Sequence, residues 1–431
     1  VEEPQSNGKT IRWCQVQVAP EGETAADGGP AVHGIVCGAG NFFVGDKVAV
    51  TLPGAVLPGP FPIAARKTYG HVSDGMIASA RELGLGNEHD GILRLAELGL
   101  DPEVGTDAIA LLGLDDVAVE INVTPDRGYA LSMRGVAREY AHSTGAAFRD
   151  PAERAWEEIQ PGTGFALAIE DAAPVRDRVG ATEFVARVVR GVDASAPTPA
   201  WMIARLTLAG VRSISLLVDI TNYVMLELGQ PLHGYDLDKL TGGITVRRAL
   251  KGETIVTLDD QTRTLHPEDL LITDGSGPIG LAGVMGGAKT EMGPDTKNVL
   301  VEAAVFDPIT IARSARRHKL PSEASKRFER GVDPIVPFVA AQRVVDLMVE
   351  LAGGTADPLG GLIGAEVFVA SIELPRRFVQ ELIGVEYTDA EITGALETIG
   401  CTVETLADAW EVIPPTWRAD LTDKWTLAEE V

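Results

Sequence analysis

The stretch "NYVMLELGQPLHGYD", from Asn222 to Asp236, decides how the middle of this chain folds. Its first half is mostly apolar, and a Gly-Gln-Pro step at 229–231 follows. Gly and Pro both interrupt helices, so this step is expected to end the preceding element. His233 comes directly after the break. A single histidine after a turn is more often structural than catalytic, so the stretch alone favours a structural role for His233.

Length and composition narrow the class of protein. The chain has 431 residues, and at roughly 100–200 residues per domain it should hold about three or four domains. Apolar runs such as Ala108–Leu112 are far shorter than the roughly 20 residues that a membrane span needs. The formal net charge of −25 argues against a nucleic-acid partner unless a local basic patch overrides it.

The cysteines predict the redox environment of the protein, and the chain ends predict whether the sequence is a fragment. Cys14, Cys37 and Cys401 form no CxxC pair and no even set, which argues against a disulfide scaffold or a zinc site and favours a reducing cytoplasm. The start "VEEPQSNGKT" resembles neither a signal nor a transit peptide, and it lacks an initiator Met. The end "TLAEEV" stops within an expected helix, so we expect a fragment of a longer protein.

The first 150 residues predict mostly β structure. Short alternating stretches bounded by Gly and Pro over 11–100 indicate a small barrel. A short helix is expected over 75–86, and a second helix is expected after Ser132 as its N-cap. A strand is expected over 115–123, with four apolar residues on one face: Val117, Val119, Ile121 and Val123.

Seams near 150–165 and 195 separate this part from an α/β region over 195–360. That region should contain a helix ending at Gly210 and two helices on either side of Pro321. The segment from 366 to the end predicts strand, helix, helix and strand. Its second helix should be capped by Thr388 or Asp389.

Three features could carry chemistry. Gly280–Gly287 is either a tight strand turn or a place where backbone approaches a ligand. Glu302 lies in the apolar run "NVLVEAAVF", and a carboxylate there must be paired or line a polar pocket because burying it alone is costly. A basic cluster is either a solvated helix face or a phosphate-binding patch. The cluster consists of Arg313, Arg316, Arg317, Lys319, Lys326, Arg327 and Arg330.

Four ordered motifs resemble one family. They are "SISLLVDITNYVMLELGQPLHGYDLDKL", "IGLAGVMGG", "VLVEAAVFDP" and "SEASKRFERGVDP". Together they resemble the bacterial phenylalanyl-tRNA synthetase β subunits, and further motifs extend the resemblance over nearly the whole chain. It implies a fragment without the C-terminal catalytic-like and anticodon-binding domains and without the first part of the N-terminal module.

The resemblance implies a multidomain α+β fold. Its expected parts are an N-terminal OB-fold β-barrel that binds tRNA over 1–107, a connecting α/β module over 108–194, a central α/β editing domain over 195–365, and a small helix-turn-helix-like α+β domain over 366–431, near the contact with the α subunit.

The resemblance also implies a division of labour. The α subunit would hold the active site for ATP-dependent aminoacylation. The β subunit would bind tRNA(Phe), assemble an (αβ)₂ heterotetramer and hydrolyse Tyr-tRNA(Phe) at an editing site. A second site is needed because a hydrophobic pocket rejects a near-isostere with one added hydroxyl only weakly. A non-catalytic tRNA-binding scaffold with a degenerate editing site is the alternative.

The family's editing residues correspond to particular positions here. His233 would orient the ester or the attacking water, and Glu302 would recognise the tyrosyl hydroxyl. Thr221 and Asn222 would add polar contacts. The pocket walls would be Ala282, Gly283 and Gly286 on one side and Ser322 and Ala324 on the other.

Near the end of the chain, Asp420, Glu429 and Glu430 correspond to a family Mg²⁺ site that is shared with the α subunit. Thr426 stands where a fourth acidic ligand is expected. From composition alone, the favoured interpretation of these acidic residues is a solvated helix start.

Overall fold

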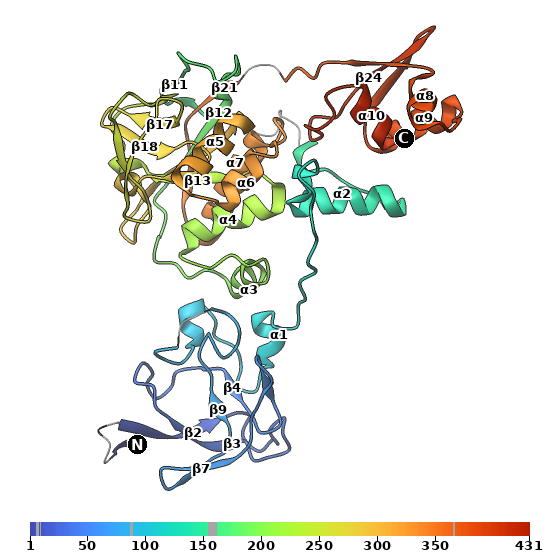
Figure 1. Ribbon diagram of the computed structural model, residues 1–431. Helices are drawn as coiled ribbons and strands as arrows, with labels where there is room; N and C mark the ends of the chain where they lie inside the picture. The colour runs from blue at the N-terminus through green and yellow to red at the C-terminus, as the bar shows by residue number, and fades with distance from the viewer. Residues whose placement is uncertain (6–7, 9, 87–88, 154–161, 365–366) are drawn as a thin grey trace. The chain divides into compact units, whose positions relative to one another are not determined.

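The chain folds into two compact units, here called unit 1 and unit 2. A computed structural model describes residues 1–431 except 6–7, 9, 87–88, 154–161 and 365–366 (Figure 1). Unit 1 comprises residues 1–120 and 195–219, and unit 2 comprises residues 121–194 and 220–431. Among the described residues, no helix has both the length and the apolarity to cross a membrane. The expected four-part division stays a prediction.

Unit 1 consists of short strands with a few small helices. Its largest sheet has the order β1-β2-β3, and the pairs β4–β9, β5–β6 and β7–β8 complete it. The predicted β-rich character is confirmed, while the OB topology stays a prediction. The strands are β1 Glu2–Pro4, β2 Thr10–Gln17, β3 Val32–Cys37, β4 Val50–Thr51, β5 Val56–Leu57, β6 Phe61–Pro62, β7 Arg66–Thr68, β8 His71–Ser73 and β9 Met76–Ile77. The helices are η1 Leu95–Leu98, α1 Ala108–Leu112 and α3 Ala200–Leu208.

Two local predictions near unit 1 are wrong. Residues 75–86 form β9 and turns instead of a helix, because Gly75 (φ 119°) and Gly84 (φ 74°) adopt left-handed backbone that a helix excludes. Residues 115–123 form no strand. Val117 and Val119 are each 78% exposed, since no neighbouring strand in the described chain pairs with this segment.

Unit 2 is built around two five-stranded sheets. The first has the order β10-β21-β12-β20-β13 and the second has the order β11-β14-β17-β18-β19. Among the described strands of these sheets, β10 pairs with β21 and β11 pairs with β14 in parallel, and the other neighbours are antiparallel. The first sheet contains β10 Thr163–Gly164, β12 Ala181–Arg190, β13 Leu232–Asp236, β20 Asn298–Phe306 and β21 Thr355–Gly364. The second contains β11 Leu167–Glu170, β14 Ile244–Arg248, β17 Leu270–Asp274, β18 Gly277–Leu281 and β19 Met285–Gly286, and a separate hairpin pairs β15 Thr254–Val256 with β16 Thr262–Thr264.

The strands β12 and β20 are largely buried on both faces, which explains the nearly unbroken apolar sequence of β20. One face packs against helix α7, Pro337–Ala352. The other face contributes Phe184 and Leu300 to a core shared with Ile272 and Leu281 of the second sheet. Since side chains alternate along a strand, Glu302 shares the face of Leu300 and lies between the two sheets.

Helices confirm several predictions. Ser132 caps α2, Met133–Thr144, by accepting a hydrogen bond from the Gly135 backbone N–H. Helix α3 ends just before Gly210, and α5 and α6 lie on either side of Pro321. The remaining helices of this part are η2 Gly128–Ala130, η3 Pro151–Glu153, α4 Leu216–Leu228, η4 Leu237–Lys239, η5 Ala288–Thr290, α5 Pro308–His318 and α6 Glu323–Phe328.

The C-terminal part of unit 2 has its own small core, which includes Leu374, Leu396, Trp410 and Leu427. The predicted order of strand, helix, helix and strand is confirmed, and Thr388 caps the second helix with a capping box. A further strand and helix follow. The elements are β22 Ile372–Pro375, α8 Phe378–Ile383, α9 Asp389–Thr398, β23 Thr402–Thr405, β24 Ala409–Ile413 and α10 Lys424–Glu430.

Candidate functional site

The Gly-Gln-Pro step ends α4 and starts the strand that carries His233. Helix α4 stops at Leu228, and Gly229 adopts a left-handed conformation with φ 82°. Gln230 is fully buried, and its side-chain N–H donates to the backbone oxygen of Ala304 at 3.0 Å. This bond ties the start of β13 to β20, so the break fixes the register of the two strands.

That register places His233 directly opposite Glu302. Directly opposed residues of antiparallel strands point to the same face, so the two predicted editing residues come together between the sheets. Tyr235, two residues further along β13, shares this face. Its hydroxyl donates to Oε2 of Glu302, and its ring meets the His233 ring edge-on with centroids 4.5 Å apart.

Burial determines the charge states of Glu302, His233 and Tyr235. Glu302 is only 6% exposed, and the loss of hydration raises its pKa to about 7, against the lowering effect of the Tyr235 hydrogen bond. Burial lowers the pKa of His233 to about 4 and raises that of Tyr235 well above its ordinary value. At neutral pH the imidazole is therefore neutral, while Glu302 is poised between its ionised and protonated forms.

Gly286 forms a close wall against the imidazole. A Cβ at this position would lie 2.5 Å from Cε1 and 2.7 Å from Nε2 of His233, so only glycine lets β19 approach so closely. Nε2 of His233 is buried, and within the described part of the chain it has no hydrogen-bond partner. A buried nitrogen without a partner is costly in free energy unless a ligand or water satisfies it.

The other predicted wall residues lie close to the same turn but already have structural roles. Gly283 has φ 66°, and a Cβ there would meet Phe328 at 2.9 Å, so glycine is required for core packing. The Ser322 hydroxyl caps α6 and donates to the Val284 backbone oxygen at 3.1 Å. Ala282 is buried, and Ala324 packs against the same core. Contact of these residues with a substrate stays a prediction.

Thr221 and Asn222 lie on α4, where Thr221 is buried and Asn222 is half-buried. Their contacts with a substrate also stay a prediction.

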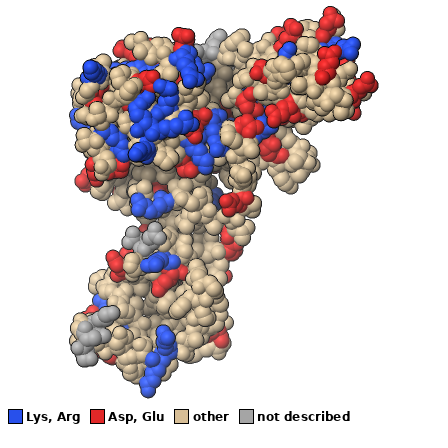
Figure 2. All heavy atoms as spheres, viewed as in Figure 1, with Lys and Arg blue, Asp and Glu red and all other residues tan. Residues whose placement is uncertain are grey.

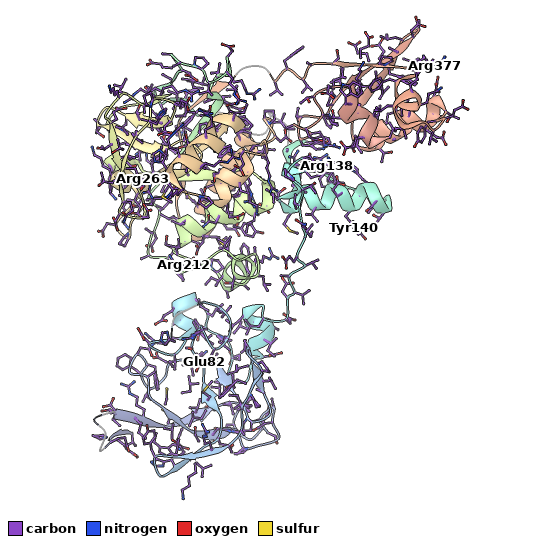
Figure 3. All side chains as sticks on the ribbon, in the orientation of Figure 1. Glu82, Arg138, Tyr140, Arg212, Arg263 and Arg377 are labelled. Carbon is purple, nitrogen blue, oxygen red and sulfur yellow. The ribbon has the colours of Figure 1, made fainter. Side chains whose placement is uncertain are left out.

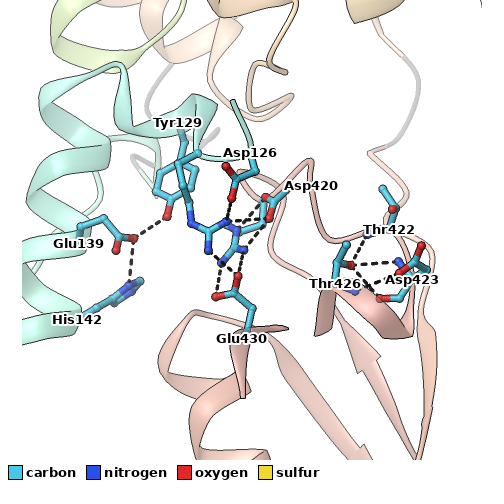
Figure 4. Close-up of polar contacts among 11 residues, drawn as sticks. Asp126, Tyr129, Glu139, His142, Asp420, Thr422, Asp423, Thr426 and Glu430 are labelled. Carbon is cyan, nitrogen blue, oxygen red and sulfur yellow. Dashed lines mark hydrogen bonds and ion pairs between the residues drawn. The ribbon is translucent and has the colours of Figure 1, made fainter. Parts of the chain in front are cut away.

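The predicted metal residues are arranged differently. Asp420 and Glu430 come together, but two arginines hold them (Figure 4). Arg418 Nη2 lies 2.6 Å from Asp420 Oδ2 and 2.6 Å from Glu430 Oε1. Arg127 Nη1 lies 3.2 Å from Asp420 Oδ2, and its Nη2 lies 2.6 Å from Glu430 Oε1. We refer to these four side chains as the arginine-acid cluster.

The arginine-acid cluster does not fit a Mg²⁺ site. Arg127 and Arg418 each pair with both carboxylates, and Arg127 also lies 2.6 Å from Asp126, so the oxygens that would bind a hard cation already accept from guanidinium groups. Glu429 is exposed on α10, and the Thr426 hydroxyl takes part in the α10 capping box. Among the described residues, no three or more metal-binding side chains gather.

Known proteins match the whole chain. A B3/4 domain family matches residues 180–353, and a tRNA synthetase B5 domain family matches residues 372–431. The chain is 72% identical over 436 residues to a phenylalanine–tRNA ligase β subunit of Leifsonia xyli and 50% identical over 451 residues to that of Bifidobacterium longum. Each match covers 100% of this chain and 52% of the relative, so the chain spans about half the length of these curated relatives.

The chain belongs to the phenylalanine–tRNA ligase β-subunit family.

Within this family frame, the His233–Glu302 pair lies in the B3/4 domain and the acidic residues of the arginine-acid cluster lie in the B5 domain. Sequence reasoning missed Tyr235, although its spacing of two from His233 on a strand would have indicated a shared face. It also missed Arg418, which stands two residues before Asp420.

The basic cluster is largely engaged by acidic neighbours. Arg313 and Arg317 each lie 2.7 Å from Glu268, and Arg327 is buried against Glu323 at 2.7 Å. Figure 2 shows Lys and Arg gathering over the part of unit 2 that holds α5 and α6 in this view, whereas Asp and Glu dominate the visible face of the C-terminal part. A phosphate-binding role for the remaining exposed cations stays a prediction.

Proposed function

We propose that this chain is the editing and tRNA-binding part of a phenylalanyl-tRNA synthetase β subunit, which hydrolyses mischarged Tyr-tRNA(Phe). It would act in the cytoplasm within an (αβ)₂ heterotetramer, whose α subunit attaches phenylalanine to tRNA(Phe) with ATP. The observation that carries the editing assignment is the pairing of His233 with Glu302 between the two sheets.

Glu302 supplies the selectivity in this proposal. As a buried acceptor it forms a hydrogen bond with the phenolic hydroxyl of a tyrosyl group. A phenylalanyl group would leave the same carboxylate desolvated and without this partner, which costs more than the bond itself contributes. A site built around a hydroxyl therefore refuses the analogue that lacks it, and correctly charged tRNA is spared.

His233 supplies the positioning of the reacting groups. Its neutral imidazole has a free ring nitrogen that can hold the ester carbonyl or a water molecule by a hydrogen bond. Hydrolysis then proceeds by attack of a positioned water, helped by the tRNA ribose hydroxyl, and no covalent intermediate is required.

Magnesium and ATP belong to the aminoacylation step of the proposed holoenzyme. Because the arginine-acid cluster does not fit a Mg²⁺ site, no step of the editing reaction is assigned to a metal.

The test is deacylation of Tyr-tRNA(Phe) by holoenzyme assembled from the α subunit and a complete β subunit. Glu302→Ala should slow this reaction about 100-fold, or about 2.7 kcal/mol, because the phenol loses its acceptor. Phe-tRNA(Phe) should be spared by both enzymes.

The matched control is Glu183→Ala. Glu183 is another buried glutamate of the first sheet, and burial also raises its pKa to about 7. This variant should deacylate Tyr-tRNA(Phe) at the wild-type rate. If Glu302→Ala retains the wild-type rate as well, the role given to Glu302 is wrong.

A further inference from the structure

Among the residues that the structure describes, Tyr235 is the side chain that forms a hydrogen bond with Glu302, the selectivity group of the proposed site. It is 1% exposed, and its hydroxyl donates to Oε2 of Glu302. Its ring packs edge-on against His233, so it contacts both members of the pair. The aromatic body alone would fill this space, and the hydroxyl must therefore find a buried partner, which is Glu302.

The bond determines what Glu302 can offer to a ligand. An ionised carboxylate has two oxygens that accept hydrogen bonds, whereas a protonated one is a donor on one oxygen. Tyr235 occupies Oε2, and this leaves the second oxygen as the acceptor for a ligand. The hydroxyl also turns the carboxylate toward Tyr235, while His233 Nε2 keeps no partner in the described chain.

We propose that Tyr235 is a positioning residue that determines specificity, because its hydroxyl holds Glu302 as an oriented acceptor for the phenol of the tyrosyl group. The inference rests on the proposed editing function. Two phenols would then share one carboxylate, one from the protein and one from the substrate.

The electrostatics agree with this geometry. Burial raises the pKa of Glu302, and the Tyr235 hydrogen bond acts in the opposite direction. Asp274 of β17 also raises the pKa of Tyr235. His233 faces the pair and is neutral above its lowered pKa of about 4. Removal of the Tyr235 hydroxyl should therefore leave Glu302 protonated over a wider range of pH.

The experiment compares holoenzymes with wild-type β subunit and with Tyr235→Phe, which keeps the ring and removes only the hydroxyl. Rates of Tyr-tRNA(Phe) deacylation are measured from pH 5.5 to pH 9 after subtraction of the rate without enzyme. The acid limb of the variant should move upward by about one pH unit, since a hydrogen bond to a charged group is lost. KM for Tyr-tRNA(Phe) should rise more than kcat falls, and activity should recover near pH 9.

Tyr129→Phe is the matched control. The Tyr129 hydroxyl donates to Glu139 Oε1 at 2.6 Å, so the same chemical change removes a phenol–glutamate bond outside the site (Figure 4). Its pH profile should superimpose on that of wild type. If the Tyr235→Phe profile superimposes as well, the inference is overturned.

A second readout separates this inference from the proposed function. Side-chain ¹³C resonances of Glu302 are titrated in the full chain, assigned through Glu302→Gln. An upward shift of the titration in Tyr235→Phe supports the hold of the hydroxyl on Glu302, independently of any deacylation rate. A wild type that deacylates nothing would instead refute the editing function. An unchanged titration overturns the inference.

Discussion

Unit 2 contains two carboxylate sites that were both predicted from sequence similarity. They differ in the side chains that surround the carboxylate. Glu302 is buried between two sheets, and its partner in the structure is the neutral Tyr235. Glu430 is also mostly buried, with its side chain 11% exposed, but two arginines surround it. Burial raises the pKa of the first carboxylate, whereas the second is held between two guanidinium groups.

This difference indicates what each site can do. A carboxylate with a raised pKa and no cation is destabilising for the fold. At Glu302 it also lies opposite His233, whose buried Nε2 has no partner in the described chain, and the two features together point to a ligand. A carboxylate paired with guanidinium groups stabilises contacts between segments. The arginine-acid cluster joins Arg127 to the B5 domain. Arg138, labelled on α2 in Figure 3, lies over the Trp417 ring, with its Cζ 3.4 Å from the ring centroid.

The largest expected loss of stability comes from a substitution that disrupts the arginine-acid cluster. Arg418→Ala removes a guanidinium that is 2% exposed and leaves Asp420 and Glu430 without their main partner. Loss of one member of a buried ion pair costs about 3–5 kcal/mol, so the free energy of unfolding should fall by about that amount in urea titrations of the chain.

Arg127→Ala is the companion variant, because Arg127 contacts the same two carboxylates but is 30% exposed. Its loss should cost about 1 kcal/mol or less. Equal losses in the two variants would show that burial does not distinguish the two arginines.

The next largest effect is the pH dependence of stability that the buried Glu302 causes. Its pKa is about 7 in the folded chain and about 4.5 in the unfolded chain, so the folded chain binds more protons between these values. Stability is therefore lost as pH rises from about 4.5 to 7, and by roughly 3 kcal/mol in total. Glu302→Gln should raise the free energy of unfolding by about that amount at pH 8 and change it little near pH 4.5.

The measurement is urea unfolding of wild type and Glu302→Gln at both pH values. Deacylation should fall in the same variant, because the charged acceptor is gone. If the difference in stability between Glu302→Gln and wild type is the same at pH 8 and pH 4.5, the pKa of Glu302 is not raised in the folded chain.

The sequence predicted helices and strands better than it predicted which of them pack together. The carboxylate in "NVLVEAAVF" was recognisable as unusual, yet its contact with His233 depends on the register of β13 against β20, which follows from tertiary packing. Periodicity likewise predicted a strand over 115–123, but a strand needs a neighbour, and Val117 and Val119 have none in the described chain.

The acidic C-terminal site shows the same limit. Sequence similarity identified Asp420 and Glu430, but the arginines that neutralise them come from two places in the chain. Arg418 is local, whereas Arg127 is brought in by the fold. A ligand set can be recognised by spacing, while the charge that remains on it depends on long-range neighbours.

The central claim is that Glu302 recognises a phenolic hydroxyl. A crystal structure of the chain with bound L-tyrosine tests this most directly, with L-phenylalanine as the control ligand. We expect the tyrosine ring to lie between the two sheets, with its hydroxyl oxygen within hydrogen-bond distance of the Glu302 carboxylate. We expect no phenylalanine to bind there. Tyrosine bound elsewhere, or both amino acids bound alike, would contradict the claim.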